Sequence, residues 1–569
     1  MTSPIISRRS IDRPPSGWDP SVPEILQSIY AARGVYTPAD VELRLKLLHS
    51  PSKLGSIDKA ARIIAEAIIN DQQITIAGDY DCDGATGASV AVRGLRLLGA
   101  TKVGFIVPNR FKHGYGLSPA LVDDMDPATE LIITVDSGVS SVEGVNRAKS
   151  KGIAVVITDH HLPGDYLPNA DAIVNPNLNG DEFPSKMLAG VGVMFYVLLA
   201  VRSVLRGAGR WATEPSLLPL LDLVAIGTVA DLVPLDHNNR ILVAAGLDRI
   251  QRGLANVGVK ALIKVAKKDE ANFVSSDIAF AIAPRLNAAG RLEDMSLGVM
   301  TLISDDPVAA ASYAERLEEI NGERKELQAE MVAEAEQMVL GMNIGDDVGV
   351  VVFDEKWHSG IVGLVASRLK ENLYRPVIAF APAGEGSDEV RGSARSIPGF
   401  HLRDALALVD VRNPGLIPKF GGHAMAAGLS LKIKDVERFK LEFQKVAKQL
   451  LSEEQLTAVV YSDGELPPGY LNLDFAKYLQ RCGPWGQAFP EPVFDNVFYV
   501  DDFRVLSDKH LKLDLIDPRD GSSAEAIFFN GYKGGDPPTQ VRLAYEMNIN
   551  RWRDTERLQL MVRHLELVE

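Results

Sequence analysis

The chain has 569 residues, which at roughly 100 to 200 residues per domain predicts three or four domains. Its 46% hydrophobic and 24% charged residues exclude bulk disorder and collagen-like repeats. The two cysteines, Cys82 and Cys482, exclude a disulfide framework and a cysteine-rich metal cluster, and they suit a reducing compartment. We find no run of 18 apolar residues and no apolar export signal near the start, so we expect a cytoplasmic location.

The net charge of −15 argues against nucleic-acid binding only if the charge is spread evenly. It is not, because residues 305–336 contain ten acidic and three basic residues, which account for nearly half of the net charge. A phosphate-binding groove elsewhere in the chain therefore remains compatible with the composition.

Short apolar runs alternate with amphipathic segments in the first half of the chain. The runs rich in Val and Ile predict buried strands at residues 73–78, 103–107, 131–135 and 154–158. Between them lie segments with helical spacing, such as residues 85–98 and 139–151. This alternation predicts a parallel sheet with helices on both faces.

The rest of the chain predicts three further parts. Residues 186–262 are mostly helical, and the acidic stretch after Asp305 has the apolar spacing of one long helix that ends near Gly341. A second α/β pattern follows, and from about Val460 the apolar period becomes two, which predicts a β domain. We therefore expect an N-terminal segment (1–70), a first α/β domain (71–300), a connector helix (301–345), a second α/β domain (346–452) and a β domain (460–569).

Acidic side chains follow three of the predicted parallel strands. Because ligands bind outside the carboxyl ends of such strands, these side chains are expected to converge in one crevice. Carboxylates that face one another repel unless cations bridge them, and carboxylate and imidazole ligands suit Mn²⁺ or Mg²⁺. The residues concerned are Asp79, Asp81 and Asp83 after the first strand, Asp136 after the third, Asp159, His160 and His161 after the fourth, and Asp231 after an apolar helix.

Each of these residues also has a simpler interpretation. The Asp-x-Asp-x-Asp-Gly run at Asp79 resembles a calcium loop, but its twelfth residue is Val90 and not glutamate. Asp136 alone fits a turn, Asp159 a helix cap, and Cys82 a small packing residue. Their joint occurrence at successive strand ends favours a metal site.

Several motifs resemble a known family. Asp-His-His after a strand, with Asp-x-Asp-Gly on the first strand, is similar to the DHH phosphoesterase superfamily. Residues 108–117 (PNRFKHGYGL), 283–291 (APRLNAAGR) and 420–428 (FGGHAMAAG) resemble its bacterial RecJ exonuclease family, and the likeness extends from about Ser28 to the C-terminus. The resemblance implies a parallel-sheet DHH catalytic domain, a long connector helix, an α/β DHHA1 domain and a C-terminal OB-like β-barrel.

The same resemblance implies an enzyme, a two-metal-ion phosphodiesterase. It would degrade single-stranded DNA in the 5′→3′ direction to 5′-mononucleotides, in DNA repair and recombination, with two Mn²⁺ or Mg²⁺ ions. The matching metal ligands are Asp81, Asp83, Asp136, His160 and Asp231, joined by Asp79. Ala77 stands where many relatives carry a histidine, and Asp159 and His161 are placed beside the ligands or at the substrate as catalytic groups.

The resemblance also implies substrate-binding residues, namely Arg110, Arg285, Asn287, Ser393, Arg395, Gly421, Gly422 and His423. Ser393 and Arg395 suit a phosphate clamp because residues two apart on a strand face the same way. Gly421 and Gly422 allow backbone amides to approach an anion. We expect Arg110 to join Ser393 and Arg395 in a pocket for a terminal 5′-phosphate.

These residues have structural alternatives too. The arginines can form ion pairs within the protein, the glycines can form a turn, and Asn287 can be a turn former. In the OB-like domain, the aromatic residues stack on bases or, more commonly, pack in the core. They are Phe498, Tyr499, Phe503 and Trp552.

Two other functions remain open at this stage. Shorter members of the superfamily cleave short oligonucleotides or cyclic dinucleotides, and an inert scaffold derived from the same fold is the third alternative. The extra β domain and the long helix favour a polymeric substrate, and the carboxylates named above are all present, which argues against a scaffold. We expect a monomer that cooperates with a single-stranded-DNA-binding protein and a helicase, with no membrane partner.

Overall fold

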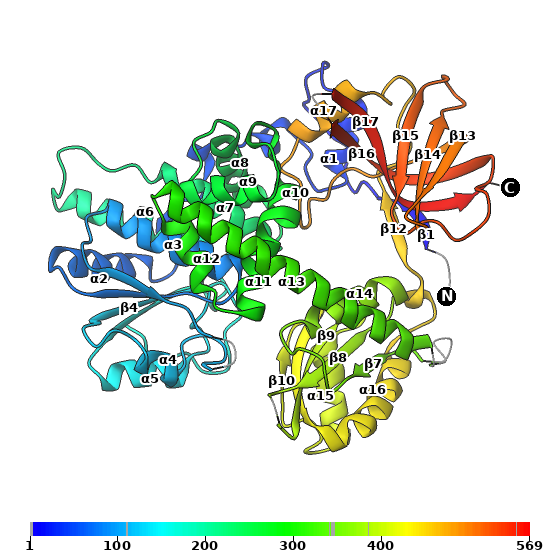
Figure 1. The fold of residues 1–569 in the computed structure, drawn as a ribbon. Coiled ribbons are helices and arrows are strands. Elements are labelled where there is room, and N and C mark those ends of the chain that lie inside the picture. Colours follow the sequence, from blue (N-terminus) through cyan, green and yellow to red (C-terminus); the bar gives the residue numbers. More distant parts are fainter. Residues whose placement is uncertain are drawn as a thin grey trace.

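The computed structural model describes residues 4–109, 112–340, 342, 347–384, 386–552 and 555–568. It contains a first α/β unit, a second α/β unit and a barrel unit, and a long helix runs from the first to the second (Figure 1). The barrel unit and the second α/β unit both lie on one side of the first unit (Figure 1). This architecture confirms the expected fold class.

The first α/β unit is built on a parallel sheet of five strands. Their order is β3-β2-β4-β5-β6, and every neighbouring pair is parallel. The first four match the predicted strands, whereas β6 was not predicted. The strands are β2 (Ile74–Ala77), β3 (Val103–Ile106), β4 (Leu131–Val135), β5 (Ala154–Thr158) and β6 (Ala172–Val174).

Helices cover both faces of this sheet, as the alternating sequence pattern predicts. On one face α2 (Ile57–Ile69), α3 (Cys82–Leu97) and α6 (Gly190–Gly207) pack on Ile74, Ile76 and Ile133. The other face carries α4 (Pro119–Asp123) and α5 (Val142–Ser150). By length and average hydropathy α6 passes for a membrane span, but 67% of it is buried inside the protein, as is typical of a core helix.

A helical layer completes the first unit and leads into the long helix. It comprises α7 (Leu221–Ala230), α8 (His237–Gln251), α9 (Val257–Val265), α10 (Ser275–Asp277), α11 (Ala283–Leu292) and α12 (Ser296–Ile303). The long helix is α13 (Pro307–Leu340). Leu317 of α13 packs in the core of the first unit and Met331 packs in the core of the second, so α13 holds the two units together.

The second α/β unit has a mixed sheet in the order β10-β11-β9-β8-β7. Only β7 and β8 are parallel. One face is covered by α14 (Val362–Leu373), and the other by α15 (Leu402–Arg412) and α16 (Val436–Leu450). The strands are β7 (Val350–Phe353), β8 (Val377–Pro382), β9 (Glu389–Arg395), β10 (Lys419–Gly422) and β11 (Ala426–Lys432).

The C-terminal strands form a closed barrel in the order β13-β14-β15-β17-β16. Alternate side chains such as Leu511, Leu513 and Leu515 fill its core, as the period-two pattern predicts. A helix, α17 (Leu473–Arg481), precedes the barrel. The strands are β13 (Phe494–Leu506), β14 (His510–Ile516), β15 (Ser523–Phe528), β16 (Gln540–Trp552) and β17 (Thr555–Leu567).

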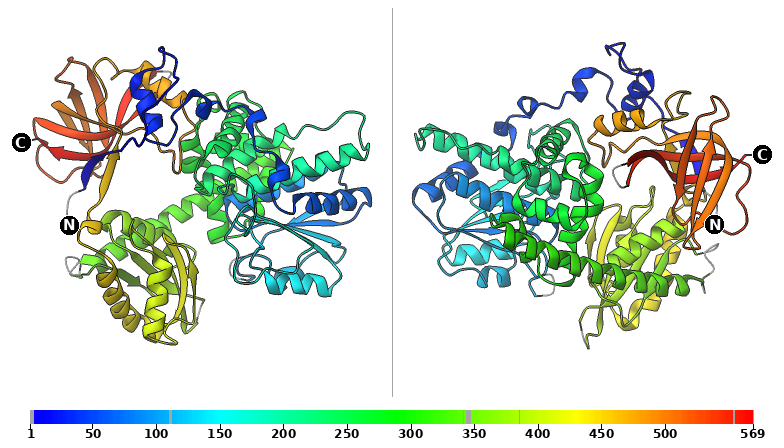
Figure 2. Two further views of the ribbon diagram at one scale, coloured as in Figure 1. Left: turned by 180° about the vertical axis from the view of Figure 1, so that it is seen from behind. Right: turned by 45° about the horizontal axis from the view of Figure 1, so that its top comes forward.

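The N-terminal segment joins the barrel unit to the first α/β unit, which the sequence did not reveal. Its strand β1 (Ile5–Arg8) pairs in parallel with β12 (Val459–Ser462), and helix α1 (Glu24–Ala31) follows. Arg33 forms an ion pair with Asp463 at 2.7 Å, with both side chains about 1% exposed. The segment then runs from the barrel unit to the first unit, as the blue ribbon in Figure 2 shows.

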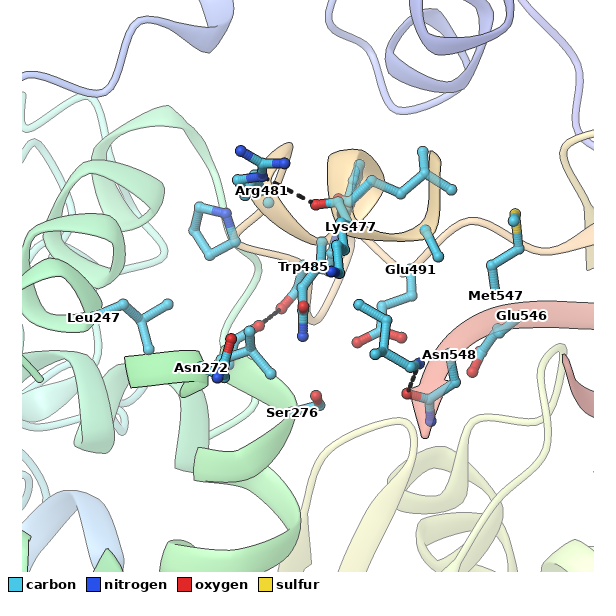
Figure 3. A pocket seen from close by; sticks show the side chains of 18 of the residues that line it. Leu247, Asn272, Ser276, Lys477, Arg481, Trp485, Glu491, Glu546, Met547 and Asn548 are labelled. Carbon is cyan, nitrogen blue, oxygen red and sulfur yellow. Dashed lines mark hydrogen bonds between the residues drawn. The ribbon is translucent and has the colours of Figure 1, made fainter. Parts of the chain in front are cut away.

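A cavity of about 530 Å³ lies where the barrel unit meets the helical layer (Figure 3). Helices α8 and α10 line one side, and α17 and β16 line the other. The Ser275 hydroxyl donates to the carbonyl oxygen of Trp485 across this junction at 2.6 Å. None of the predicted site residues that the structure describes lines the cavity.

Candidate metal centre

The loop after β2 and the first turn of α3 carry three of the predicted ligands. Asp81 caps the N-terminus of α3, and its Oδ1 accepts a hydrogen bond from the Gly84 amide at 3.0 Å. A Cβ on Gly84 would lie 2.6 Å from the backbone of Asp79, so only glycine allows the loop to fold this closely. The loop and the start of α3 thereby place Asp79, Asp81 and Asp83 at the carboxyl end of the sheet.

Asp136 ends the central strand β4 in a strained conformation. Its φ of +62° lies in the left-handed region, which residues other than glycine adopt mainly where the surrounding structure enforces it. Helix α6 begins directly against it, since a Cβ on Gly190 would lie 2.5 Å from the Asp136 Cβ. Asp136 is 1% exposed, so its carboxylate is fixed in the centre of the crevice.

The same helix N-terminus holds Asp83. Its two oxygens accept hydrogen bonds from the Gly190 amide at 2.6 Å and the Val191 amide at 2.9 Å. These bonds and the helix dipole favour the ionised form. Burial and the charge of Asp81 outweigh them and raise the pKa of Asp83 to about 7.

The two histidines after β5 have different surroundings. His160 Nε2 lies 3.1 Å from Asp136 Oδ1, 3.4 Å from Asp231 Oδ2 and 4.0 Å from Asp83 Oδ2. His161 Nδ1 instead lies 2.8 Å from Oδ1 of the buried Asp159. His160 therefore points into the group of carboxylates, and His161 pairs with Asp159.

These surroundings give the two imidazoles different charge states at neutral pH. Burial, reinforced by the neighbouring His161, lowers the pKa of His160 to about 4, so its ring is neutral. Burial acts in the same direction on His161, but the hydrogen bond to Asp159 and the charges of Asp159, Asp79 and Asp81 together outweigh it and raise the pKa of His161 to about 9. His160 has the lone pair that a metal ligand needs, whereas His161 carries a positive charge.

The crevice fits divalent cations. Burial, followed by the charges of neighbouring carboxylates, raises the pKa of Asp136 and of Asp231 well above the usual range. Asp136 Oδ1 and His160 Nε2 are buried without a hydrogen-bond partner among the described residues, which is costly unless a ligand satisfies them. The potential ligands form three groups, and within each group the ligand atoms lie within 4.8 Å of one another. The groups are Asp79, Asp81 and Asp136; Asp83, His160 and Asp231; and Asp136, His160 and His161.

Sequence reasoning missed the residues that hold the histidines in place. Asn177 donates to the His160 carbonyl at 2.6 Å, and Asn175 donates to the His161 carbonyl at 2.8 Å. Both follow β6, so the strand-end rule would have found them if this three-residue strand had been recognised. Tyr115 was also missed, and its ring lies edge-on to His161 with centroids 6.0 Å apart.

Two predicted substrate contacts also have structural roles. Asn287 on α11 accepts a hydrogen bond from the Cys82 amide at 2.8 Å, which fixes the metal-binding loop, and it lies within a helix and not in a turn. Arg285 is 8% exposed and forms an ion pair with Glu318 of α13. Arg110 lies outside the described residues.

Ser393 and Arg395 lie on β9 beside the N-terminus of α14. A Cβ on Gly363 would lie 3.1 Å from Arg395 Nη2 and 3.5 Å from Ser393 Oγ. Arg395 donates to the Ala394 carbonyl at 2.8 Å and forms no ion pair with a carboxylate of the described part of the chain. Burial lowers its pKa. The Arg395 guanidinium thus lies beside the positive end of the α14 dipole. Together the two favour the binding of an anion between them.

The glycine motif extends this surface across the sheet. Gly421 and Gly422 end β10, and β11 pairs its Gly428 with both Gly421 and Ser393. A Cβ on Gly421 would meet no atom within 4 Å, so the surface is open there. His423 is exposed at the following turn, where its amide donates to the Ala426 carbonyl at 2.8 Å.

The barrel aromatics separate into core and surface residues. Phe498 is fully buried and packs against Tyr545, so it serves the core. Tyr499 is 49% exposed, and Phe503 is half-buried. The Trp552 side chain lies outside the described residues.

The three units match known domain families in the expected order. Residues 73–228 match the DHH family, N-terminal domain; residues 345–453 match the DHHA1 domain; and residues 462–564 match the RecJ OB domain. Single-stranded-DNA-specific exonuclease RecJ of Dickeya dadantii is 47% identical over 557 residues, which cover 96% of each chain. The chain belongs to the RecJ family. The Escherichia coli RecJ exonuclease is 44% identical over 570 residues, 98% of each chain.

Solved RecJ structures carry the divalent cations that the crevice suggests. Thermus thermophilus RecJ in complex with Mn²⁺ aligns with a TM-score of 0.79 and 29% identity, over 96% of this chain and 76% of that one. The same protein in complex with Mg²⁺ aligns with a TM-score of 0.75. This RecJ-family chain therefore shares its fold with metal-binding relatives.

Proposed function

We propose that this chain is a metal-dependent exonuclease that degrades single-stranded DNA in the 5′→3′ direction and releases 5′-mononucleotides. The observation that carries the proposal is the crevice at the carboxyl end of the first sheet. There, buried carboxylates face a neutral His160, and Asp136 Oδ1 and His160 Nε2 lack partners in the described structure. Family membership supports the same activity.

The ligand set suits two divalent cations. Asp79, Asp81 and Asp136 would hold one of them, and Asp83, His160 and Asp231 would hold the other. Bound cations would activate a water molecule and stabilise the charge that develops on the scissile phosphate. Oxygen ligands and one imidazole are compatible with either Mn²⁺ or Mg²⁺.

The remaining residues position the ligands and the substrate. Asp159 holds His161 in its charged form, which places a cationic donor beside the crevice. The hydroxyl of Tyr115 lies 3.4 Å from both nitrogens of that imidazole. We propose that His161 stabilises the negative charge of the phosphate, as a preorganised donor does in phosphoryl transfer.

We assign recognition of the 5′ end to the second α/β unit. Ser393 and Arg395 offer a hydroxyl and a guanidinium at a helix N-terminus, and a terminal phosphate carries more charge than an internal diester. We propose Arg110, which the sequence predicts for the same pocket, as its third member. The exposed glycines of β10 and β11 allow a strand to lie flat beside it.

Cleavage of a long 5′-phosphorylated single strand, a 5′-hydroxyl strand, a blunt duplex and a cyclic dinucleotide, each with Mn²⁺ and with EDTA, tests the proposal. The expected result is rapid release of mononucleotides from the phosphorylated strand, little cleavage of the duplex and none with EDTA. Preferred cleavage of the dinucleotide would instead identify a short-substrate phosphodiesterase, and no cleavage of any substrate would identify a scaffold.

An enzyme confined to single strands depends on other proteins for its substrate. We therefore propose that a helicase exposes the strand and that a single-stranded-DNA-binding protein delivers it to a monomeric enzyme in the cytoplasm. Pull-down of each candidate with the purified chain, and stimulation of cleavage on a tailed duplex, would test these partnerships.

A further inference from the structure

Two arginines of the acidic helix α13 have very different surroundings. Arg316 forms ion pairs with Glu293, Glu319 and Glu323, which come from both sides of it. Arg324 lies two turns further along the same helix. It donates to Asn321 Oδ1 at 2.5 Å and to Gln328 Oε1 at 2.8 Å, but no carboxylate of the described residues forms an ion pair with it.

The missing counter-charge at Arg324 is unexpected on so acidic a helix. Arg285 of α11 forms an ion pair with Glu318, one turn before Asn321. Burial, followed by repulsion from Arg285, lowers the pKa of Arg324. Two neighbouring cations, one of them without an acid, are stabilised when an anion binds between or beside them.

The surroundings of Arg324 supply further donors. Asn321 is 1% exposed, and its side-chain nitrogen has no hydrogen-bond partner among the described residues. Arg324 itself is half-buried, and within the described structure it donates hydrogen bonds to two neutral amide oxygens. A bound oxyanion would accept from these groups in charge-assisted bonds, which are about twice as strong as neutral ones.

The position of Arg324 relates it to the substrate path. It lies between Leu317, which packs in the core of the first unit, and Met331, which packs in the core of the second. It thus occupies the part of α13 that passes from the metal-bearing unit to the unit with Ser393 and Arg395 (Figure 1). The α11 helix that fixes the metal loop through Asn287 packs against this part of α13.

We propose that Arg324, supported by Asn321, binds an internal phosphate of the DNA strand at the junction of the two α/β units. This inference rests on the proposed function, because its ligand is the backbone of that single-stranded substrate. Arginine is suited to the task, since its planar guanidinium binds two phosphate oxygens at once.

The test compares Arg324→Gln with the matched control Arg316→Gln, both in the full-length protein. Binding of a long 5′-phosphorylated oligothymidylate is measured in EDTA, which prevents cleavage, over a series of salt concentrations. For Arg324→Gln we expect about tenfold weaker binding and a salt slope smaller by about 0.7, the value for one lost phosphate contact on a single strand. Arg316→Gln is expected to keep the wild-type affinity and slope, because its charge is already neutralised within the protein.

A second variant separates phosphate binding from a structural role. Arg324→Lys keeps the charge and is expected to retain the wild-type salt slope with reduced affinity. The inference is overturned if Arg324→Gln changes the salt slope no more than Arg316→Gln does. A variant that loses thermal stability but keeps the wild-type salt slope has this same meaning, because Arg324 would then have only a structural role. Failure of the proposed function is distinguishable, because the wild-type protein would then release no mononucleotides from the single strand in Mn²⁺, whatever the salt slopes of the variants.

Discussion

The metal crevice and the clamp on β9 are built in opposite ways. In the crevice, buried carboxylates converge, and burial and mutual repulsion raise the pKa values of Asp83, Asp136 and Asp231. In the clamp formed by Ser393 and Arg395, Arg395 lies beside a helix N-terminus and forms no ion pair with a carboxylate of the described residues. One region thus favours cations and the other favours anions. This difference predicts that strand cleavage and strand binding depend on separate residues, so that substitutions can separate the two.

The largest effect is expected from Asp136→Ala. Because Asp136 belongs to two of the three potential ligand groups, its loss should lower the rate of strand cleavage by about a thousandfold. Binding of single-stranded DNA should change little, since the clamp is intact. Single-turnover cleavage and equilibrium binding, measured on the same preparation, check both halves of this expectation. Wild-type turnover at equal metal concentration would remove Asp136 from the metal site.

Metal binding should reverse the stability order of the same two proteins. Without metal, Asp136→Ala should unfold at a higher temperature than the wild type, because one buried repulsive carboxylate is gone. With Mn²⁺ at a hundred times its Kd, the wild type should gain about 2.7 kcal/mol and become the more stable protein. Thermal unfolding with EDTA and with Mn²⁺ measures the reversal. An unchanged order would show that the crevice does not bind the ion.

A substitution on the clamp should affect binding more than chemistry. Arg395→Ala is expected to weaken strand binding about tenfold, to flatten its salt slope by about 0.7 and to reduce the preference for a 5′-phosphate. The turnover number at saturating strand should stay near that of the wild type. Arg412→Ala is the control, because Arg412 is exposed on α15, across the sheet from the clamp, and donates to Gln449. If Arg395→Ala keeps the full phosphate preference, the terminus is recognised elsewhere.

The smallest effect is expected from Asn177→Ala. This change removes one neutral hydrogen bond to the His160 carbonyl, worth about 1 kcal/mol, so half-maximal activity should need about fivefold more Mn²⁺. Activity in excess Mn²⁺ should recover, because every metal ligand remains. Metal titrations of cleavage measure this shift. A loss of activity that excess Mn²⁺ does not restore would assign Asn177 a role beyond positioning.

The sequence by itself was sufficient to predict the parallel sheet and the convergence of its strand-end residues. Buried parallel strands are continuous apolar runs, and their carboxyl ends must meet at one edge, so Asp79, Asp136 and His160 could be placed together without coordinates. The connector helix and the barrel were predictable for a similar reason, because periods of 3.6 and 2 are local signals.

Only the tertiary structure decided what depends on distant partners. Arg285 and Arg395 are both arginines for which the sequence predicts phosphate binding. Glu318 of α13 forms an ion pair with Arg285, whereas no carboxylate of the described chain forms one with Arg395. Strand β6 has only three residues, and β1 pairs with a strand more than 450 residues away. An ion pair or a strand pair forms between groups that folding brings together, and local sequence patterns carry no information about which partner, if any, will be there.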